Sequence, residues 1–166
     1  MPTSSSWWSL AVCACGLVAT AQADDLVRSA PTPEEVRAVE QCVLAVPDVA
    51  GRRMCIGVVS APCQDTPDGA TTLGSNACLG REYRAWDGLL NGYYREAMDA
   101  FNDEGRSYLK STQRAWLAFR DPACGWPYRA YPGGTIAGPL AAGCLMTQTA
   151  LQALDLLDLR TMLHQR

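Results

Sequence analysis

The cysteines constrain the fold of this chain more than any other feature of its sequence. Of its eight cysteines, six follow an apolar N-terminal segment: Cys42, Cys55, Cys63, Cys78, Cys124 and Cys144. In an exported protein an even set of cysteines is normally paired, so we expect three disulfides. Six cysteines allow roughly 15 connectivities, and among these we favour pairing between sequence neighbours: Cys42–Cys55, Cys63–Cys78 and Cys124–Cys144.

The N-terminal segment predicts that the chain is exported. An apolar stretch over residues 7–18 is followed by Ala21 and Ala23, whose spacing is typical of signal cleavage before Asp24. We therefore interpret residues 1–23 as a secretory signal, with no basic side chain in front of the apolar stretch. The mature protein is expected in the periplasm or outside the cell.

Two alternatives to a cleaved signal are disfavoured by the length of the same stretch. A membrane anchor would need about 20 apolar residues to span a bilayer, which is more than this segment supplies. Lipidation at Cys13 or Cys15 would need a longer apolar stretch before the cysteine. We expect no membrane insertion after cleavage.

Charge and composition exclude several classes of function. The net charge is −3, and no charged side chain lies in residues 1–23, so the mature chain keeps this charge. Mild acidity disfavours nucleic acid and anionic membranes and permits attraction to a basic protein partner. There is no C-x-x-C motif and His164 is the only histidine, so we expect no metal and no cofactor. Asp155 and Asp158 are interpreted as a solvated face rather than a catalytic pair.

The first part of the mature chain predicts two helices and a loop. Thr32-Pro33-Glu34-Glu35 has an N-cap, a proline at the first helical position and an acid at N3, so a helix is expected through Val43. Asp48 can cap a second, short helix that extends to about Val59. Residues 62–74 are rich in Pro, Gly, Asp and Thr, as is typical of a loop.

The rest of the chain predicts a long helix hairpin and a central last helix. Apolar residues recur every three or four positions over 75–102, and a second helix with a similar stripe ends before Pro122. The short connection between them favours antiparallel packing. Residues 124–138 are expected to form a loop, followed by a helix over about 139–163. The predicted fold class is all-α: a disulfide-linked helical bundle of about five helices.

The hairpin carries a specific set of polar and aromatic residues. Its motif reads Y-x-x-W-D-x-x-L-N-x-x-Y, then Q-x-x-W-x-x-x-R-D-x-x-C, with Gly133-Gly134-Thr135 and Cys144-Leu145 further on. This order resembles the N-terminal domain of the lysozyme inhibitor LprI-like family, which consists of exported, helical, cysteine-linked bacterial proteins. The matching residues of the motif are Trp86, Asp87, Asn91, Tyr94, Gln113, Trp116, Arg120 and Asp121, which we interpret as structural.

The resemblance implies a division of the chain and a function. Residues 63–166 are expected to form the LprI-like domain and residues 24–62 an N-terminal helical extension with the disulfide Cys42–Cys55. One departure is Gln152, because the family usually has an arginine at this position. The implied function is that of an exported, non-enzymatic binding protein that inhibits lysozyme. The alternative is an envelope interaction or stress protein without activity on lysozyme.

The loop between Cys124 and Cys144 contains the strongest candidate for partner binding. Three aromatic residues and an arginine lie within six positions: Trp126, Tyr128, Arg129 and Tyr131. Exposed aromatics beside an arginine are typical of interface hot spots. The alternative is that the aromatics fold inward and cover the end of the hairpin. The sequence alone favours neither.

Overall fold

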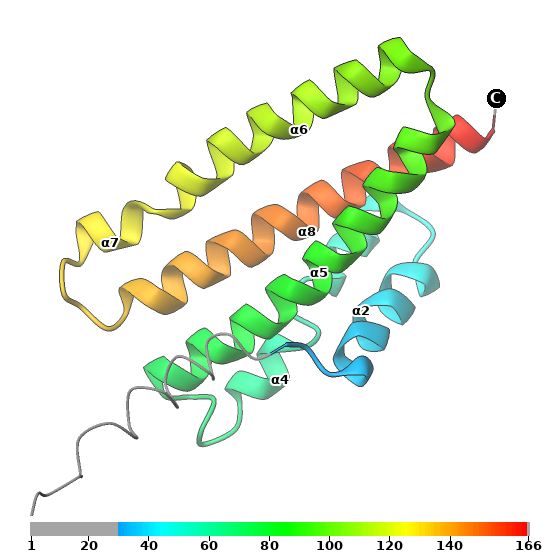
Figure 1. The fold of residues 1–166 in the computed structure, drawn as a ribbon. Helices are drawn as coiled ribbons and strands as arrows, with labels where there is room; N and C mark the ends of the chain where they lie inside the picture. Colours follow the sequence, from blue (N-terminus) through cyan, green and yellow to red (C-terminus); the bar gives the residue numbers. More distant parts are fainter. Residues whose placement is uncertain (1–29, 166) are drawn as a thin grey trace, which may run out of the picture.

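The computed structural model describes residues 30–165, and all regular secondary structure in this range is helical. The longer helices are α2 (Pro33–Ala45), α5 (Thr72–Ala100), α6 (Asp103–Cys124) and α8 (Ala137–His164), and the short ones are α3 (Val49–Arg52), the 3₁₀ helix η1 (Arg53–Cys55), α4 (Ser60–Gln64) and α7 (Trp126–Ala130). Figure 1 shows them as one bundle. The predicted all-α, disulfide-linked fold class is confirmed. The predicted signal, residues 1–23, lies outside the described residues.

The centre of the bundle is the pair formed by α5 and α8, which run in the same direction (Figure 1). Small residues allow the two helices to approach closely, since Ala85, Ala97, Ala150 and Ala153 are all almost fully buried. Around them pack Trp86 and the leucines of both helices. Burial of such a continuous apolar surface is the main source of the stability of a helical domain.

Helix α6 returns antiparallel to α5 and α8 and closes the predicted hairpin. Its N-cap is Asn102, whose side chain accepts a hydrogen bond from the Gly105 N–H. Only Leu109, Gln113, Arg120 and Cys124 of α6 are buried. Helix α6 is therefore held mainly by a few specific side chains, whereas α5 and α8 share a continuous core.

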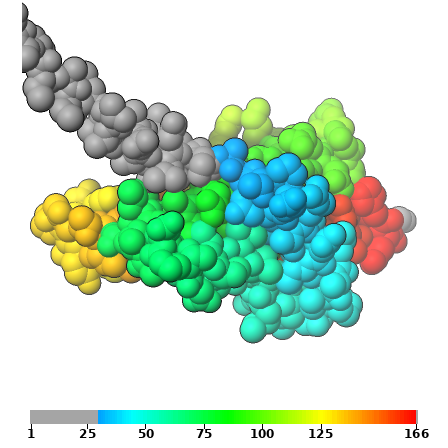
Figure 2. Space-filling view, turned by 90° about the horizontal axis from the view of Figure 1, so that it is seen from below, coloured from blue at the N-terminus to red at the C-terminus, as the bar shows by residue number. Residues whose placement is uncertain are grey.

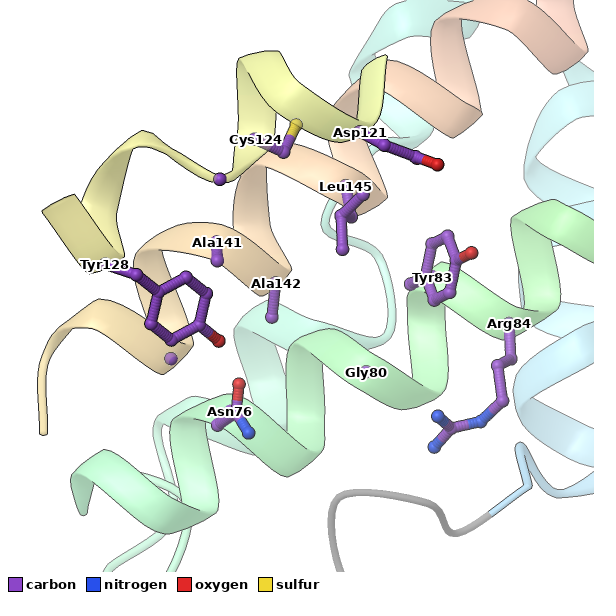
Figure 3. Close-up of a pocket in the computed structure, with 12 residues that line it drawn as sticks. Asn76, Gly80, Tyr83, Arg84, Asp121, Cys124, Tyr128, Ala141, Ala142 and Leu145 are labelled. Atoms are coloured by element: carbon purple, nitrogen blue, oxygen red, sulfur yellow. The ribbon is translucent and has the colours of Figure 1, made fainter. Parts of the chain in front are cut away.

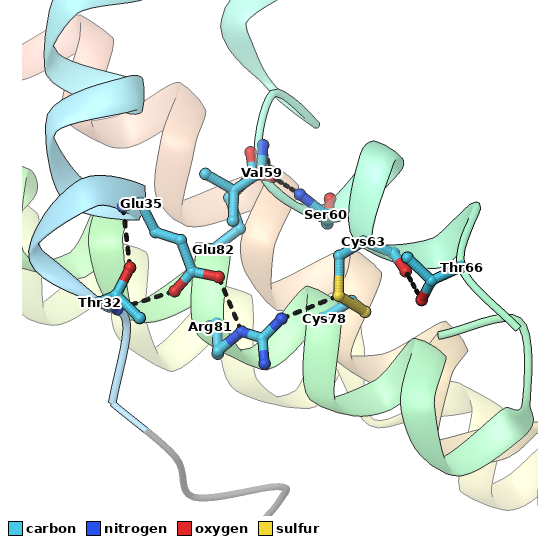
Figure 4. Close-up of polar contacts among 9 residues, drawn as sticks. All are labelled: Thr32, Glu35, Val59, Ser60, Cys63, Thr66, Cys78, Arg81 and Glu82. Carbon is cyan, nitrogen blue, oxygen red and sulfur yellow. Dashed lines mark hydrogen bonds and ion pairs between the residues drawn. A yellow bond between two sulfur atoms is a disulfide. The ribbon is translucent and has the colours of Figure 1, made fainter. Parts of the chain in front are cut away.

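The N-terminal helices cover a different face of the α5–α8 pair, which is seen in the foreground of Figure 2. The predicted capping box of α2 is present, because Thr32 and Glu35 exchange side-chain and backbone hydrogen bonds. Glu35 also forms an ion pair with Arg81 of α5, with 2.9 Å between Oε1 and Nε (Figure 4). Val39 and Val43 of α2 join the same core as the long helices.

The disulfides join segments that are neighbours in the sequence. Cys42–Cys55 links α2 to η1, Cys63–Cys78 links α4 to α5, and Cys124–Cys144 links the end of α6 to α8. This is the local pairing expected from the sequence. Three disulfides are typical of a protein that matures in an oxidising compartment.

Several expected boundaries were wrong. The single helix expected from Asp48 to Val59 is divided into α3, η1 and a turn at Gly57, whose φ of 103° is incompatible with a right-handed helix. Asp48 does cap α3 through the Gly51 N–H. The loop expected over 62–74 contains the end of α4 and the start of α5.

The end of α6 and the loop after it also differ from expectation. Helix α6 continues through Pro122 to Cys124, because a proline in the last turn costs few hydrogen bonds and Cys124 is anchored to α8. The expected loop over 124–138 contains α7, which has Pro127 in its first turn. Proline is favoured at that position because its φ is already helical.

Helix α8 is long and apolar enough to cross a membrane by length and composition alone. In this structure its apolar residues have another explanation, because Leu154, Leu156 and Leu157 are buried in the core beside α5. A helix at the centre of a bundle needs apolar side chains on most of its circumference.

Candidate protein-binding surface

Helix α7 lies at one end of the bundle (Figure 1), and it contains three of the four residues predicted for partner binding, while the fourth, Tyr131, is its C-cap. Trp126, Tyr128 and Tyr131 are 51%, 59% and 46% exposed, and Arg129 is exposed as well. We call these four residues the α7 surface. About half of each aromatic side chain is therefore accessible to solvent.

The four residues of the α7 surface do not form a single cluster. The rings of Trp126 and Tyr131 are neighbours, with centroids 6.5 Å apart and planes tilted by 52°. Tyr128 extends from α7 toward Ala142 on the side of α5, as Figure 3 shows. Arg129 forms no ion pair within the part of the chain that the structure describes.

The α7 surface is supported by the backbone on both sides. Cys124 precedes α7 and is bonded to Cys144 of α8, and Pro127 within α7 is fully buried. The turn after α7 contains Gly133, which has a φ of 73°. A left-handed residue at this turn favours glycine, because other residues are strained there. The segment is therefore fixed at both ends, with its aromatic side chains partly exposed.

A pocket of about 380 Å³ lies between α5, α8 and the α6–α7 junction, and Tyr128 forms one of its walls (Figure 3). Small residues such as Gly80, Ala141 and Ala142 line its base, and Tyr83 and Asp121 line it at the other end. Arg84 also lines it, and burial lowers the pKa of this guanidinium from its ordinary value. The α7 surface therefore borders a concave pocket through Tyr128.

Most of the motif residues that we interpreted as structural line a second concavity, between α5 and α6. We call it the α5–α6 cleft; its volume is also about 380 Å³. Its lining residues are Asp87, Leu90, Asn91, Tyr94, Lys110, Gln113, Arg114, Trp116, Leu117 and Arg120. Those of α5 follow the spacing i, i+3, i+4, i+7, so they form one helix face. The motif residues of α5 and α6 therefore form part of the two opposite walls of this cleft.

Arg120 lines this cleft and is largely buried. Its guanidinium lies 4.9 Å from the ring centroid of Trp116 and 5.9 Å from that of Tyr83. The carboxylate of Asp121 accepts from it at 2.7 and 2.8 Å, and Thr149 of α8 accepts at 3.3 Å. With its side chain 9% exposed and this set of partners, Arg120 ties α6 to both core helices.

Two other motif residues hold the cleft together by hydrogen bonds. Asn91 donates to the backbone oxygen and to the carboxylate of Asp87, one turn earlier on α5. Gln113 of α6 accepts from Gln152 of α8 at 3.3 Å. Gln152 thus reaches a motif residue across the helix interface.

The structure contains one site that the sequence interpretation missed. The fully buried carboxylate of Glu82 accepts hydrogen bonds from the backbone N–H groups of Gly57, Val59 and Ser60 and from the indole of Trp86. Figure 4 shows it beside Val59 and Ser60. Its sequence signal is a charged residue four positions before Trp86, on a buried helix face. Lys110 and Arg114, two of the three cations that line the α5–α6 cleft, were also missed.

In residues 30–165 no group of three or more His, Cys, Asp or Glu side chains is placed to hold a metal ion. Asp155 and Asp158 lie on the outer side of α8, where Asp158 forms an ion pair with Arg52 at 2.9 Å. The fold and the α7 surface thus define a disulfide-linked helical protein with exposed aromatic and cationic side chains, which is a class suited to binding other proteins.

Comparison with known proteins assigns the chain to a family. It belongs to the lysozyme inhibitor LprI family, whose model matches residues 63–156. It is also similar to an uncharacterized protein of Rhizobium meliloti (strain 1021), with 31% identity over 111 residues that cover 59% of this chain and 80% of the relative. No solved structure matches this chain.

Proposed function

We propose that this protein is exported, has no enzymatic activity, and inhibits lysozyme by binding it through the α7 surface. The observation that carries the proposal is the exposure of Trp126, Tyr128 and Tyr131 around the exposed Arg129. Aromatic residues and arginine dominate the binding energy of most protein interfaces. The family to which the chain belongs is named for lysozyme inhibition.

The support for α7 favours tight binding. Cys124–Cys144 and the buried Pro127 hold the backbone in one conformation, so little entropy is lost when a partner binds. A lysozyme cleft contains two carboxylates that take part in glycoside hydrolysis. Arg129 has no ion-pair partner among residues 30–165 and can approach such carboxylates without breaking an internal pair.

A lysozyme turbidity assay with the purified, oxidised protein tests the proposal. We expect the native protein to slow lysis at micromolar concentration and Arg129→Ala with Tyr131→Ala to lose most of this inhibition. The matched control is Arg37→Ala with Leu44→Ala, which removes an exposed cation and an exposed apolar residue from α2 instead. Thermal melts of both double variants should match that of the native protein, because all four side chains are exposed.

Each outcome of this assay has a defined meaning. Full inhibition by the Arg129→Ala, Tyr131→Ala variant would remove the α7 surface from the proposal. No protection by the native protein would contradict lysozyme inhibition and favour the alternative, an envelope protein that docks on a different partner. In that case co-purification from the envelope would identify the partner.

A further inference from the structure

The floor of the α5–α6 cleft contains a buried hydrogen-bond donor without a partner. Gln113 is 9% exposed and lines the cleft. Its oxygen accepts from Gln152, and its Nε2 atom has no hydrogen-bond partner within the described chain. Buried polar groups are nearly always satisfied, and one explanation for a group that is not is an ordered water molecule or a bound ligand beside it.

The charges of the cleft favour an anion. Lys110 and Arg114 are one turn apart on α6, and neither forms an ion pair within residues 30–165. Asp87, on the opposite wall, is the one carboxylate among the residues that line the cleft, and Arg120 is neutralised by Asp121. The cleft therefore has a single positive charge in excess, although the whole chain is acidic. A monoanion would match this charge.

The walls of the cleft are apolar and aromatic. Leu90 and Tyr94 of α5 face Trp116 and Leu117 of α6. Leu117 is 42% exposed, which leaves part of this apolar wall open to solvent. An apolar wall beside a few polar groups is the usual composition of a small-ligand site, and the volume of about 380 Å³ lies within the usual range.

We propose that the α5–α6 cleft binds a carboxylate attached to an apolar body. The carboxylate accepts hydrogen bonds from Lys110 and Arg114, which line the cleft together with the buried Gln113, and the apolar body lies against Trp116 and Leu90. A guanidinium matches the planar geometry of a carboxylate. The ligand chemistry fits a small apolar acid and the C-terminus of a polypeptide that ends in an apolar residue.

Binding of N-acetyl-leucine to the oxidised protein, followed by ¹H–¹⁵N NMR, tests this proposal. We expect saturable shifts of the Gln113 side-chain amide and of the Trp116 indole N–H. N-acetyl-leucinamide, which has the same apolar body without the charge, should bind at least about tenfold more weakly because the charge-assisted hydrogen bonds are lost. Equal binding of the acid and the amide would overturn the proposal.

Variants show whether the named cations are responsible. Lys110→Ala with Arg114→Ala should weaken binding of N-acetyl-leucine at least about tenfold, whereas the control Arg37→Ala with Arg95→Ala, on other exposed surfaces, should leave it unchanged. Unchanged binding by the first double variant, or the absence of shifts in the native protein, would also overturn the proposal.

A pentapeptide with a free C-terminal leucine separates the two sources of the carboxylate. Binding about tenfold tighter than that of N-acetyl-leucine identifies a polypeptide C-terminus, and equal binding identifies a small acid; both results support the site. The proposal is independent of lysozyme inhibition. Lys110→Ala with Arg114→Ala should leave inhibition intact, and Arg129→Ala with Tyr131→Ala should leave N-acetyl-leucine binding intact.

Discussion

At the scale of single residues, Glu82 accepts hydrogen bonds from three backbone N–H groups and from the Trp86 indole. Its carboxylate accepts hydrogen bonds from the backbone N–H groups of Val59 and Ser60, and both of these bonds are buried. If the carboxylate is removed, these two N–H groups lose their acceptor in a buried environment. Glu82 also fixes Gly57, whose left-handed conformation turns the chain from η1 toward α4. One acid therefore attaches the whole turn to α5.

Substitution of Glu82 should be strongly destabilising. Glu82→Ala should lower the free energy of unfolding by about 3–5 kcal/mol, because several buried donors lose their acceptor. Glu82→Gln keeps one acceptor oxygen and should lose less. Glu96→Ala, which breaks the exposed ion pair with Arg160, should cost no more than about 1 kcal/mol. Urea denaturation measures all three, and similar losses for Glu82→Ala and Glu96→Ala would contradict this account.

Asp155 gives a prediction about pH. Desolvation raises the pKa of its carboxyl, Asp158 adds repulsion, and Arg53 opposes the shift. Because the pKa is higher in the folded state, ionised Asp155 opposes folding at neutral pH, and this cost disappears as the pH falls through the folded pKa. Asp155→Asn should thus raise the melting temperature at about pH 7 and have no effect below about pH 3.

Thermal melts at both pH values check this sign. Asp99→Asn is a suitable control, because Asp99 is an exposed acid on α5. A lower melting temperature for Asp155→Asn at neutral pH would show that the carboxylate stabilises the fold. The effect should be small, since Asp155 is partly solvated.

Sequence reasoning identified residues by type and spacing but not always by role. It found the exposed residues of α7 because aromatics around an arginine are an uncommon composition, yet it could not decide whether they face inward. It missed Glu82 because a charged residue within an apolar stripe is normally assigned to the solvent face. Its partners are mostly backbone N–H groups, which any sequence supplies.

At the scale of helices, the disulfide Cys124–Cys144 controls the order of α7. Replacing both cysteines with serine should lower the free energy of unfolding by about 3 kcal/mol. It should also accelerate hydrogen exchange of the amides in α7 and the turn after it, because α7 is a short helix that directly follows Cys124 and has little stability of its own.

The variant with serine at Cys42 and Cys55 is the matched control. It removes a disulfide of similar loop length and should also lose stability, but exchange in α7 should stay as in the native protein. Hydrogen exchange followed by mass spectrometry resolves the two regions. Unchanged exchange of α7 without Cys124–Cys144 would show that its conformation does not depend on the disulfide.

The close approach of α5 and α8 gives another prediction. Ala150 is fully buried between helices, so Ala150→Leu should cost about 1–3 kcal/mol of stability through overpacking. Ala118→Leu, on the exposed side of α6, should change it by less than about 0.5 kcal/mol. Denaturant titration of both variants measures the difference. A neutral Ala150→Leu would indicate unfilled space between the helices.

Periodicity predicted the long helices and the central position of the last one, but it did not show which helix covers most of the α5 stripe. The apolar stripe of α5 showed which face is buried, and the short connection after it predicted the hairpin with α6. The dominant partner of α5 is instead α8, because alanines on both helices permit a closer approach than α6 has. A hydrophobic pattern does not encode which of two helices covers an apolar stripe. The helical conformation at Pro122 and in α7 was also not predictable, because it depends on the attachment of this segment to α8.

At the scale of the whole molecule, the net charge of −3 bears on association with a basic partner. If a basic lysozyme is bound as proposed, association should slow several-fold when NaCl is raised from about 20 mM to about 300 mM, because salt screens the long-range attraction. Dissociation should change much less. Surface plasmon resonance measures both rates. Association that is independent of salt would show that net charge has no part in encounter.

The parallel pairing of α5 and α8 has a consequence for the rate of folding. The ion pair between Glu96 and Arg160 joins residues 64 positions apart. The core between α5 and α8 can therefore form only after the intervening segment, α6 and α7, has brought α8 back alongside α5. Helical bundles usually fold fast because their contacts are local. Here the central contact between α5 and α8 is not local. Each disulfide that is already formed reduces the number of conformations the unfolded chain can adopt, and Cys124–Cys144 in particular holds the start of α8 near the end of α6. The reduced chain should therefore reach the native fold more slowly than the oxidised one.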